Sequence, residues 1–191
     1  MKIGLYFGSF NPIHIGHLVI ANYFAEFTDL NQIWFVVSPH NPLKSKSSLL
    51  DDYHRLELVN LAIDEYSKFR VSNIEFHLSQ PNYTVNTLAH LHEKYPDYEF
   101  VLIMGADNLE SIEKWKNFEY LLNNYQIYVY PRTGADGGPL KNHTSVHWVN
   151  APIMEISATM IRKSIAEGKD VRYFLPEKSY DLIQKMNFYK R

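Results

Sequence analysis

Two histidines near the start of the chain, His14 and His17, have the side chains best suited to bind a chain of phosphates. An imidazole donates hydrogen bonds to phosphate oxygens, and its pKa of about 6.5 rises beside phosphate toward the charged form. The two histidines are three positions apart, so on the first turn of a helix both rings would lie on one face. The pair could therefore hold neighbouring oxygens of one triphosphate.

The residues around the histidines predict a strand, a turn and a helix. Residues 2–7 form a short apolar run typical of a buried strand, Gly8 and Asn11-Pro12 favour a turn, and a helix is expected from about Ile15 to Phe27. The first N–H groups of a helix lack partners and its macrodipole is positive there, so a helix start favours anions. We expect a phosphate site where the first strand gives way to the first helix.

Apolar runs alternate with helical segments along the rest of the chain. Strands are expected at residues 32–37, 70–76, 98–104, 126–130 and 146–149, and helices from Asp51 to about Tyr66, from Thr84 and Ser157 as N-caps, and from Pro176. The segment 70–76 alternates enough to lie nearer an edge. The pattern predicts an α/β fold, a Rossmann-like parallel sheet with helices on both faces. A length of 191 residues fits one domain over residues 1–191, with a helical C-terminal part from about residue 157.

Polar groups follow several of these strands, where ligands of open parallel sheets bind. The loop after the second strand carries Lys44 and Lys46, either of which could reach the phosphates, although a solvated lysine is the plainer interpretation of each. Gly105 and Asp107 follow strand 98–104. Glycine allows close backbone approach and an aspartate accepts hydrogen bonds from a ribose or an amine, but Asp107 could equally cap a helix.

Two further features suggest ligand contacts. The helix expected after Ser157 carries Thr159 and Arg162 in its first turns, so its N-terminus is a second candidate anion site. Trp115 lies among charged residues. It either covers the edge of the core or stacks on a planar ring, and the sequence alone favours the core edge.

Composition excludes several classes of protein. The chain is 46% hydrophobic and 15% aromatic, as a folded globular protein is, and its net charge of −2 offers no basic field for nucleic acid or an anionic membrane. It has no cysteine, and His90 and His92 would not face one way on a helix, so no protein-held metal is expected. No apolar run approaches transmembrane length, and we expect a soluble cytoplasmic protein, compatible with a homo-oligomer.

Residues 8–17, Gly-Ser-Phe-Asn-Pro-Ile-His-Ile-Gly-His, resemble the signature of the nucleotidyltransferase superfamily, itself similar to a shortened HIGH motif of class I aminoacyl-tRNA synthetases. This resemblance implies a parallel sheet of the nucleotidyltransferase type. It also implies transfer of a nucleoside monophosphate from a triphosphate to a second substrate, with release of pyrophosphate.

Further strings resemble one branch, the bacterial nicotinate mononucleotide adenylyltransferases, and the likeness covers nearly the whole chain. The strings are Asn82-Tyr83-Thr84 with Thr87-Leu88, Gly105-x-Asp107 with Trp115 and Leu121, Tyr130-Pro131-Arg132, and Ile156-Ser157-x-Thr159-x-x-Arg162. The implied reaction joins AMP from ATP to nicotinate mononucleotide. Mg²⁺ is expected to arrive with ATP, bound largely through water.

The resemblance also implies residue roles. It implies that His14 and His17 bind the triphosphate oxygens, and that Lys44, Ser157 and Arg162 add charge and hydrogen-bond donors. It implies that the backbone around Tyr83 and Thr84 binds the nicotinate carboxylate and that Trp115 stacks on the pyridine ring. Gly105 and Asp107 would contact the nucleotide. Gly8, Ser9, Phe10, Arg132 and Thr159 complete the expected substrate contacts.

This sequence departs from the branch at Phe7, Asn82 and Asn86, and the last two affect the pyridine side. Three alternatives to this activity therefore stay open. The acceptor could be nicotinamide mononucleotide, which differs by one group, or phosphopantetheine. The chain could also be a non-catalytic nucleotide-binding module.

Overall fold

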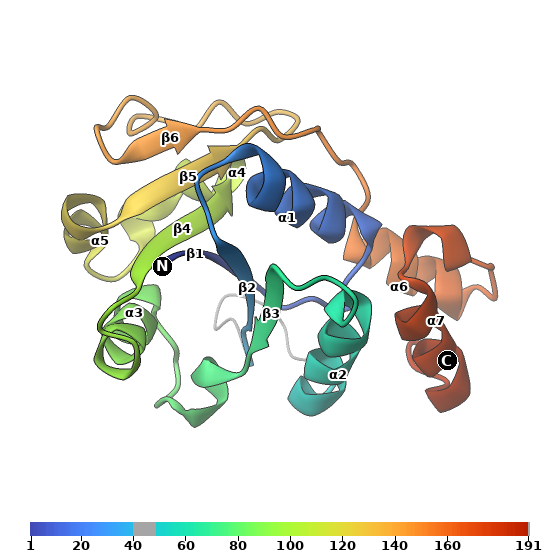
Figure 1. Cartoon of the computed structure of the whole chain (residues 1–191). Helices are drawn as coiled ribbons and strands as arrows, with labels where there is room; N and C mark the ends of the chain where they lie inside the picture. The colour runs from blue at the N-terminus through green and yellow to red at the C-terminus, as the bar shows by residue number, and fades with distance from the viewer. Residues whose placement is uncertain (40–48, 191) are drawn as a thin grey trace.

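The computed structural model describes residues 1–39 and 49–190, and within these ranges a single parallel sheet forms the centre of the fold (Figure 1). Its strands are β1 (Lys2–Gly8), β2 (Gln32–Val37), β3 (Phe69–Ser72), β4 (Glu99–Gly105), β5 (Gln126–Tyr130) and β6 (Val146–Trp148). They lie in the order β3-β2-β1-β4-β5-β6, and every neighbouring pair is parallel. The predicted α/β class is confirmed.

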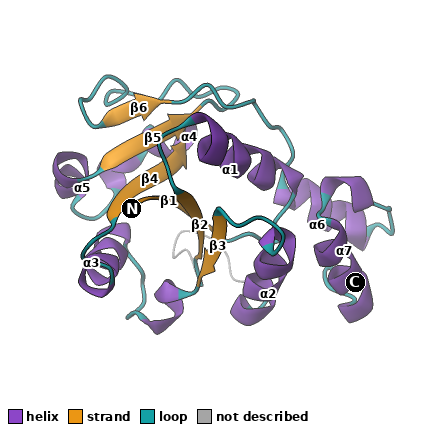
Figure 2. Cartoon of the chain, in the orientation of Figure 1, coloured by secondary structure: helices purple, strands orange, loops and turns teal. Residues whose placement is uncertain are grey.

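Helices cover both faces of the sheet, as Figure 2 shows. They are α1 (Ile15–Phe27), α2 (Asp52–Ile63), α3 (Thr84–Lys94), α4 (Ala106–Leu109), α5 (Phe118–Asn124), α6 (Ala158–Ala166) and α7 (Glu177–Met186). One apolar core joins the sheet to α1, α2, α6 and α7, and a second joins its other face to α3, α4 and α5. None of these helices, within the described part of the chain, is long and apolar enough to cross a membrane.

The apolar runs seen in the sequence are continuous because both faces of each central strand are buried. In β2, Trp34 and Val36 enter the core beneath α3, whereas Ile33, Phe35 and Val37 enter the core beneath α1. In β1 the alternation is interrupted by Gly4. A Cβ there would lie 2.6 Å from Ile103 Cδ1, so the glycine leaves room for close packing.

Some predicted boundaries were wrong. The third strand ends at Ser72, and residues Ile74–His77 form a 3-10 turn instead of continuing the strand. The reason is Glu75, whose buried carboxylate accepts a hydrogen bond from Thr87 Oγ1 (2.8 Å), so the chain turns inward at this edge. Thr84 is the first residue of α3 and not its N-cap, since Tyr83 holds the extended N-cap position. The helix after Asp51 ends at Ile63, short of Tyr66.

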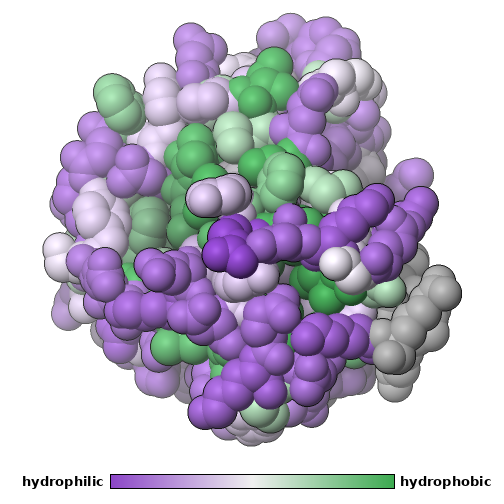
Figure 3. Space-filling view, turned by 90° about the vertical axis from the view of Figure 1, so that its right-hand side faces the viewer, coloured by the Kyte–Doolittle hydropathy of each residue, from purple (hydrophilic) through white to green (hydrophobic). Residues whose placement is uncertain are grey.

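The C-terminal helices are fastened to the rest of the fold through α2. Ser179 Oγ, on α7, donates a buried hydrogen bond to the carbonyl of Leu58 (2.8 Å), and Lys178 forms ion pairs with Asp64 and Glu65. Figure 3 views the molecule from this side and shows apolar residues gathered toward the middle of a mostly polar face. α7 is thereby held against α2.

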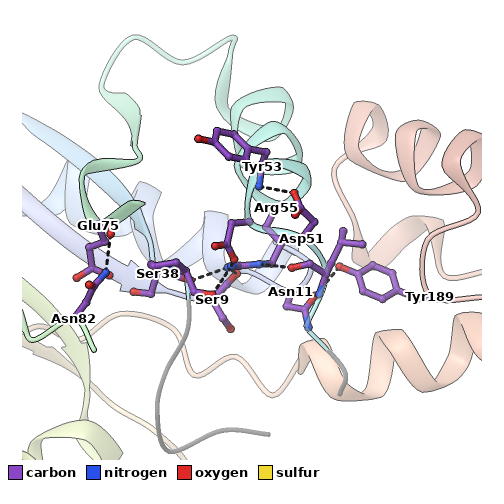
Figure 4. Close-up of polar contacts among 12 residues, drawn as sticks. Ser9, Asn11, Ser38, Asp51, Tyr53, Arg55, Glu75, Asn82 and Tyr189 are labelled. Atoms are coloured by element: carbon purple, nitrogen blue, oxygen red, sulfur yellow. Dashed lines mark hydrogen bonds and ion pairs between the residues drawn. The ribbon is translucent and has the colours of Figure 1, made fainter. Parts of the chain in front are cut away.

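Arg55, on α2, connects the loops that follow β1 and β2 (Figure 4). Its side chain is fully buried. All five of its N–H donors have partners: the carbonyls of Leu50 (2.9 Å), Ser9, Ser38 (2.9 Å) and Pro39 (3.0 Å), and the carboxylate of Asp52. The planar fork of one guanidinium therefore fixes several loop carbonyls at once.

We predict that Arg55→Lys lowers the free energy of unfolding by about 2–5 kcal/mol, because an ammonium has three donors and leaves buried carbonyls without partners. Urea unfolding would measure the change. Arg70→Lys is the matched control, since Arg70 is exposed on β3 with its guanidinium 4.9 Å from the Trp34 ring. Its loss is expected to stay below about 1 kcal/mol. Equal losses in the two variants would contradict the role assigned to Arg55.

Candidate active site

A cavity of about 450 Å³ opens at the carboxyl ends of β1 and β4, the two central strands. The chain order reverses between these strands, and this switch point is where open parallel sheets bind ligands. The predicted site residues that line the cavity are Gly8, Ser9, Phe10, His14, His17, Asp107, Arg132, Ser157, Thr159 and Arg162. Residues from both ends of the sequence therefore meet in one hollow.

The two histidines are stacked on each other at the start of α1. Their ring centroids are 3.7 Å apart with an interplanar angle of 23°. The backbone N–H of His14, the N-cap residue, donates to Nδ1 of His17 (3.2 Å). Because Nδ1 accepts, the proton of neutral His17 is on Nε2, and this nitrogen is the one that can donate to a ligand.

Burial keeps both rings neutral. It lowers the pKa of His14 to about 4, with a further contribution from the positive charge of Arg132. Burial, then His14 and Arg132, lower the pKa of His17 well below its usual value. Nδ1 of His14 is buried without a hydrogen-bond partner. The site therefore pays a desolvation cost that a bound anion can offset by favouring the charged rings.

The start of α6 faces the histidine turn and adds donors. Ser157 Oγ accepts from the N–H of Met160 (3.2 Å), which confirms it as the N-cap. Arg162 donates from Nη1 to the carbonyl of Asn11 (2.8 Å) and from Nη2 to Thr159 Oγ1 (3.3 Å). Two helix N-termini and the guanidinium groups of Arg162 and Arg132 thus border the same cavity, an arrangement that favours an anionic ligand.

Asp107 and Arg132, which also line the cavity, form an ion pair at 3.7 Å. Gly105 does not line the cavity but makes room for this pair, because a Cβ there would lie 2.9 Å from Arg132 Cγ and would collide with the Asp107 carboxylate. Both charged side chains are partly exposed, so the ion pair contributes little stability and serves mainly to place the two groups.

The predicted pyridine-side residues lie outside this cavity. Tyr83 and Thr84 are at the start of α3, and Lys116 Nζ is 4.5 Å from the Tyr83 ring, which brings the Trp115 segment beside them. Trp115 is half-buried against the core beneath α3 and α5, as the core-edge interpretation expects. Lys44 and Lys46 lie outside the described residues.

Sequence reasoning missed several residues that line the cavity, including Tyr6, Asn11 and Tyr130. The hydroxyl oxygens of Tyr6 and Tyr130 are 3.4 Å apart, and both rings are buried. Their strands, β1 and β5, are buried on both faces, so local alternation does not show that these two hydroxyls meet at the cavity. Asn11 was interpreted as a turn residue within the signature and was given no role of its own, and local sequence holds no sign of its partners.

The residues present fit a divalent ion that is carried by a substrate. Among the described residues, no group of three or more His, Cys, Asp or Glu side chains could hold a metal ion. One carboxylate, that of Asp107, lines the cavity. Mg²⁺ keeps several waters and binds through one or two carboxylates plus phosphates, so this set of donors suits an ion that enters with a nucleotide.

The strand order and the switch-point anion site define a Rossmann-like nucleotide-binding protein. Residues 5–164 match the model of the cytidylyltransferase-like family, and the chain belongs to this family and, within it, to the nicotinate-nucleotide adenylyltransferases. It is 60% identical to the probable nicotinate-nucleotide adenylyltransferase of Flavobacterium psychrophilum over the full length of both chains. It is 46% identical to that of Porphyromonas gingivalis, over 96% of this chain and 94% of the other.

Solved structures give the same likeness. The nicotinic acid mononucleotide adenylyltransferase of Plasmodium falciparum, complexed with NaAD, superimposes with a TM-score of 0.84 at 25% identity, covering 98% of this chain and 97% of the other. The same protein complexed with APC gives a TM-score of 0.81 over 98% and 96% of the two chains. The predicted resemblance is confirmed across the chain.

We predict that acid destabilises the protein through the histidine pair. The pKa of His14 is about 4 in the folded protein and about 6.5 when unfolded, so the unfolded chain binds more protons between these values. Stability conferred by neutral His14 is therefore lost as the pH falls from about 6.5 to about 4, by up to about 3 kcal/mol.

His14→Asn tests this, because asparagine is a good N-cap but does not titrate. The free energy of unfolding, measured against pH, should fall less steeply in the variant than in the wild type. Parallel curves would show that His14 does not carry the acid sensitivity.

Proposed function

We propose that this chain transfers AMP from ATP to nicotinate mononucleotide, giving nicotinate adenine dinucleotide and pyrophosphate. The observation that carries the proposal is the stacked pair His14 and His17, which shares its cavity with Arg162 and the start of α6. The full-length relatives named nicotinate-nucleotide adenylyltransferase support the reaction. We further propose that residues 1–191 act as one domain, in which the C-terminal helices complete the phosphate site.

The chemistry requires little beyond positioning and charge. The nucleophile is a phosphate oxygen of the mononucleotide, which is largely ionised at neutral pH, so no enzyme base is needed. Negative charge grows on the α-phosphoryl group and on the leaving pyrophosphate. His17 Nε2–H, His14 and the Arg162 guanidinium donate toward that charge.

The histidines are the groups whose charge changes on binding. Burial holds them neutral, whereas a triphosphate favours their protonated form. Proton uptake would therefore accompany ATP binding and leave cationic donors in place for the transfer. Mg²⁺ bound to ATP oxygens would neutralise part of the phosphate charge, with Asp107 the nearest candidate carboxylate of the cavity.

The residues predicted to bind the pyridine ring favour nicotinate mononucleotide, which is an acid, over nicotinamide mononucleotide, which is an amide. Tyr83 and Thr84 stand at the N-terminus of α3, which is 11 residues long, where the macrodipole attracts a carboxylate. Lys116 Nζ, 4.5 Å from the Tyr83 ring, adds a positive charge. An amide would gain neither attraction, and Trp115 on the adjoining segment supplies a ring to cover the pyridine.

Pyrophosphate release with ATP and Mg²⁺ tests the proposal when three acceptors are compared: nicotinate mononucleotide, nicotinamide mononucleotide and phosphopantetheine. We expect the highest kcat/KM with the acid. Preference for nicotinamide mononucleotide would refute the proposal that the N-terminus of α3 binds the nicotinate carboxylate. Release with phosphopantetheine alone would refute a pyridine mononucleotide as the acceptor. No release with any of them would favour a binding module.

Two substitutions of His17 separate the roles of its two ring nitrogens. In His17→Asn the amide oxygen can replace Nδ1 as acceptor for the His14 N–H, but the Nε2 donor is lost. In His17→Gln the amide nitrogen can replace the Nε2 donor. We expect His17→Asn to lose about 2–4 kcal/mol of transition-state stabilisation and His17→Gln to lose less. Wild-type turnover by His17→Asn would rule out the donor role.

A further inference from the structure

The last turn of the chain reaches back to the histidine turn. Tyr189 donates a hydrogen bond from its hydroxyl to Oδ1 of Asn11 (2.9 Å), although the two residues are 178 positions apart. Figure 4 shows the Tyr189 ring entering beside Asn11 from the C-terminal helices. Burial raises the pKa of the Tyr189 hydroxyl, so at neutral pH it stays protonated and remains a donor.

Asn11 is held from three directions. Its side-chain oxygen also accepts from the N–H of Leu50 (3.2 Å), and its carbonyl accepts from Arg162 Nη1 (2.8 Å). Asn11 is only 4% exposed and lies between Phe10 and His14, on the turn that delivers both histidines to the cavity. A shift of the Asn11 side chain would therefore move the turn that carries the phosphate donors.

The tyrosine is presented by an ordered helix end. Asn187 adopts the left-handed conformation (φ 55°) after α7, and the N–H of Phe188 donates to the carbonyl of Ile183 (3.0 Å), which closes the helix. The Phe188 ring is 9% exposed and packs 4.8 Å from the His54 ring on α2. Because α7 is fixed to α2, the position of the Tyr189 hydroxyl is fixed as well.

We propose that Tyr189 is a positioning residue for nucleotidyl transfer, whose hydroxyl fixes Asn11 and through it the turn that carries His14 and His17. This rests on the proposed function of that site. The hydroxyl does not line the cavity, so it acts on the donors and not on the substrate. Its contribution should appear in the transition state, where donor placement matters most.

Tyr189→Phe removes the hydroxyl and keeps the buried ring. We expect kcat to fall about 3- to 10-fold, the size of one net hydrogen bond, with the KM for nicotinate mononucleotide unchanged because the pyridine side lies elsewhere. Tyr180→Phe is the matched control. Tyr180 lies on α7 and likewise donates from its hydroxyl, to Asp170 (3.0 Å), but this contact is exposed and neither residue lines the cavity, so kcat should not change.

Asn11→Ala and the double variant complete a cycle. If Tyr189 acts through Asn11, Tyr189→Phe should have no further effect on kcat in the Asn11→Ala background. Thermal unfolding of each protein and assays well below the melting temperature separate positioning from folding. Three outcomes would each overturn the inference. They are losses in kcat that multiply in the double variant, an unchanged kcat in Tyr189→Phe, and an equal loss of kcat in Tyr180→Phe.

Wild-type activity in the same assay separates this inference from the function on which it rests. If the wild type releases no pyrophosphate with any acceptor, the proposed function fails. The same variants are then compared by calorimetric affinity for ATP with Mg²⁺. Weaker ATP binding by Tyr189→Phe, with wild-type binding by Tyr180→Phe, would still show that Tyr189 positions the histidine turn. Wild-type ATP binding by both variants would overturn that role.

Discussion

The buried guanidinium of Arg55 is the constraint on which the phosphate site depends. It binds carbonyls of Ser9 after β1 and of Ser38 and Pro39 after β2, and the N–H of Ser38 in turn donates to the carbonyl of Gly8 (2.9 Å). The loops after β1 and β2 are thus tied together by one rigid group, in addition to the packing of Phe10 and Ile13 into the core. A buried charge of this kind is costly unless every donor is paired, and here every donor is, with Asp52 supplying the counter-charge. The buried guanidinium therefore contributes more to the fixed positions of the loop carbonyls than to the free energy of unfolding.

The chemistry follows from a second tension within the same site. His14 and His17 stack closely and are desolvated, which holds both neutral, yet they stand at a helix start in a cavity that also holds Arg132 and Arg162, where an anion is favoured. Under the proposed function, a bound triphosphate would favour the protonated form of both rings. The two histidines would then become cationic, and so stronger donors, only when the phosphate ligand is bound.

The sequence was sufficient for the sheet and for most of the cavity, and physical reasons explain where it failed. Continuous apolar runs such as Gln32–Val37 require burial on both faces, and this predicts parallel strands. The early end of β3 depends on the carboxylate of Glu75 meeting Thr87 on another element, a contact that no local pattern encodes. The same limit hid the bond between Tyr189 and Asn11. The role of Trp115 remained ambiguous, because a half-buried ring can both cover the edge of the core and stack on a ligand.

Calorimetry of ATP binding with Mg²⁺, in two buffers of different ionisation enthalpy at pH about 7.5, tests the central claim most directly, because ATP itself is then ionised. The account predicts net uptake of about one to two protons per ATP by the wild type, and a smaller uptake by His14→Asn. Tight ATP binding without proton uptake by the wild type would contradict it, since the histidines would then remain neutral beside the triphosphate.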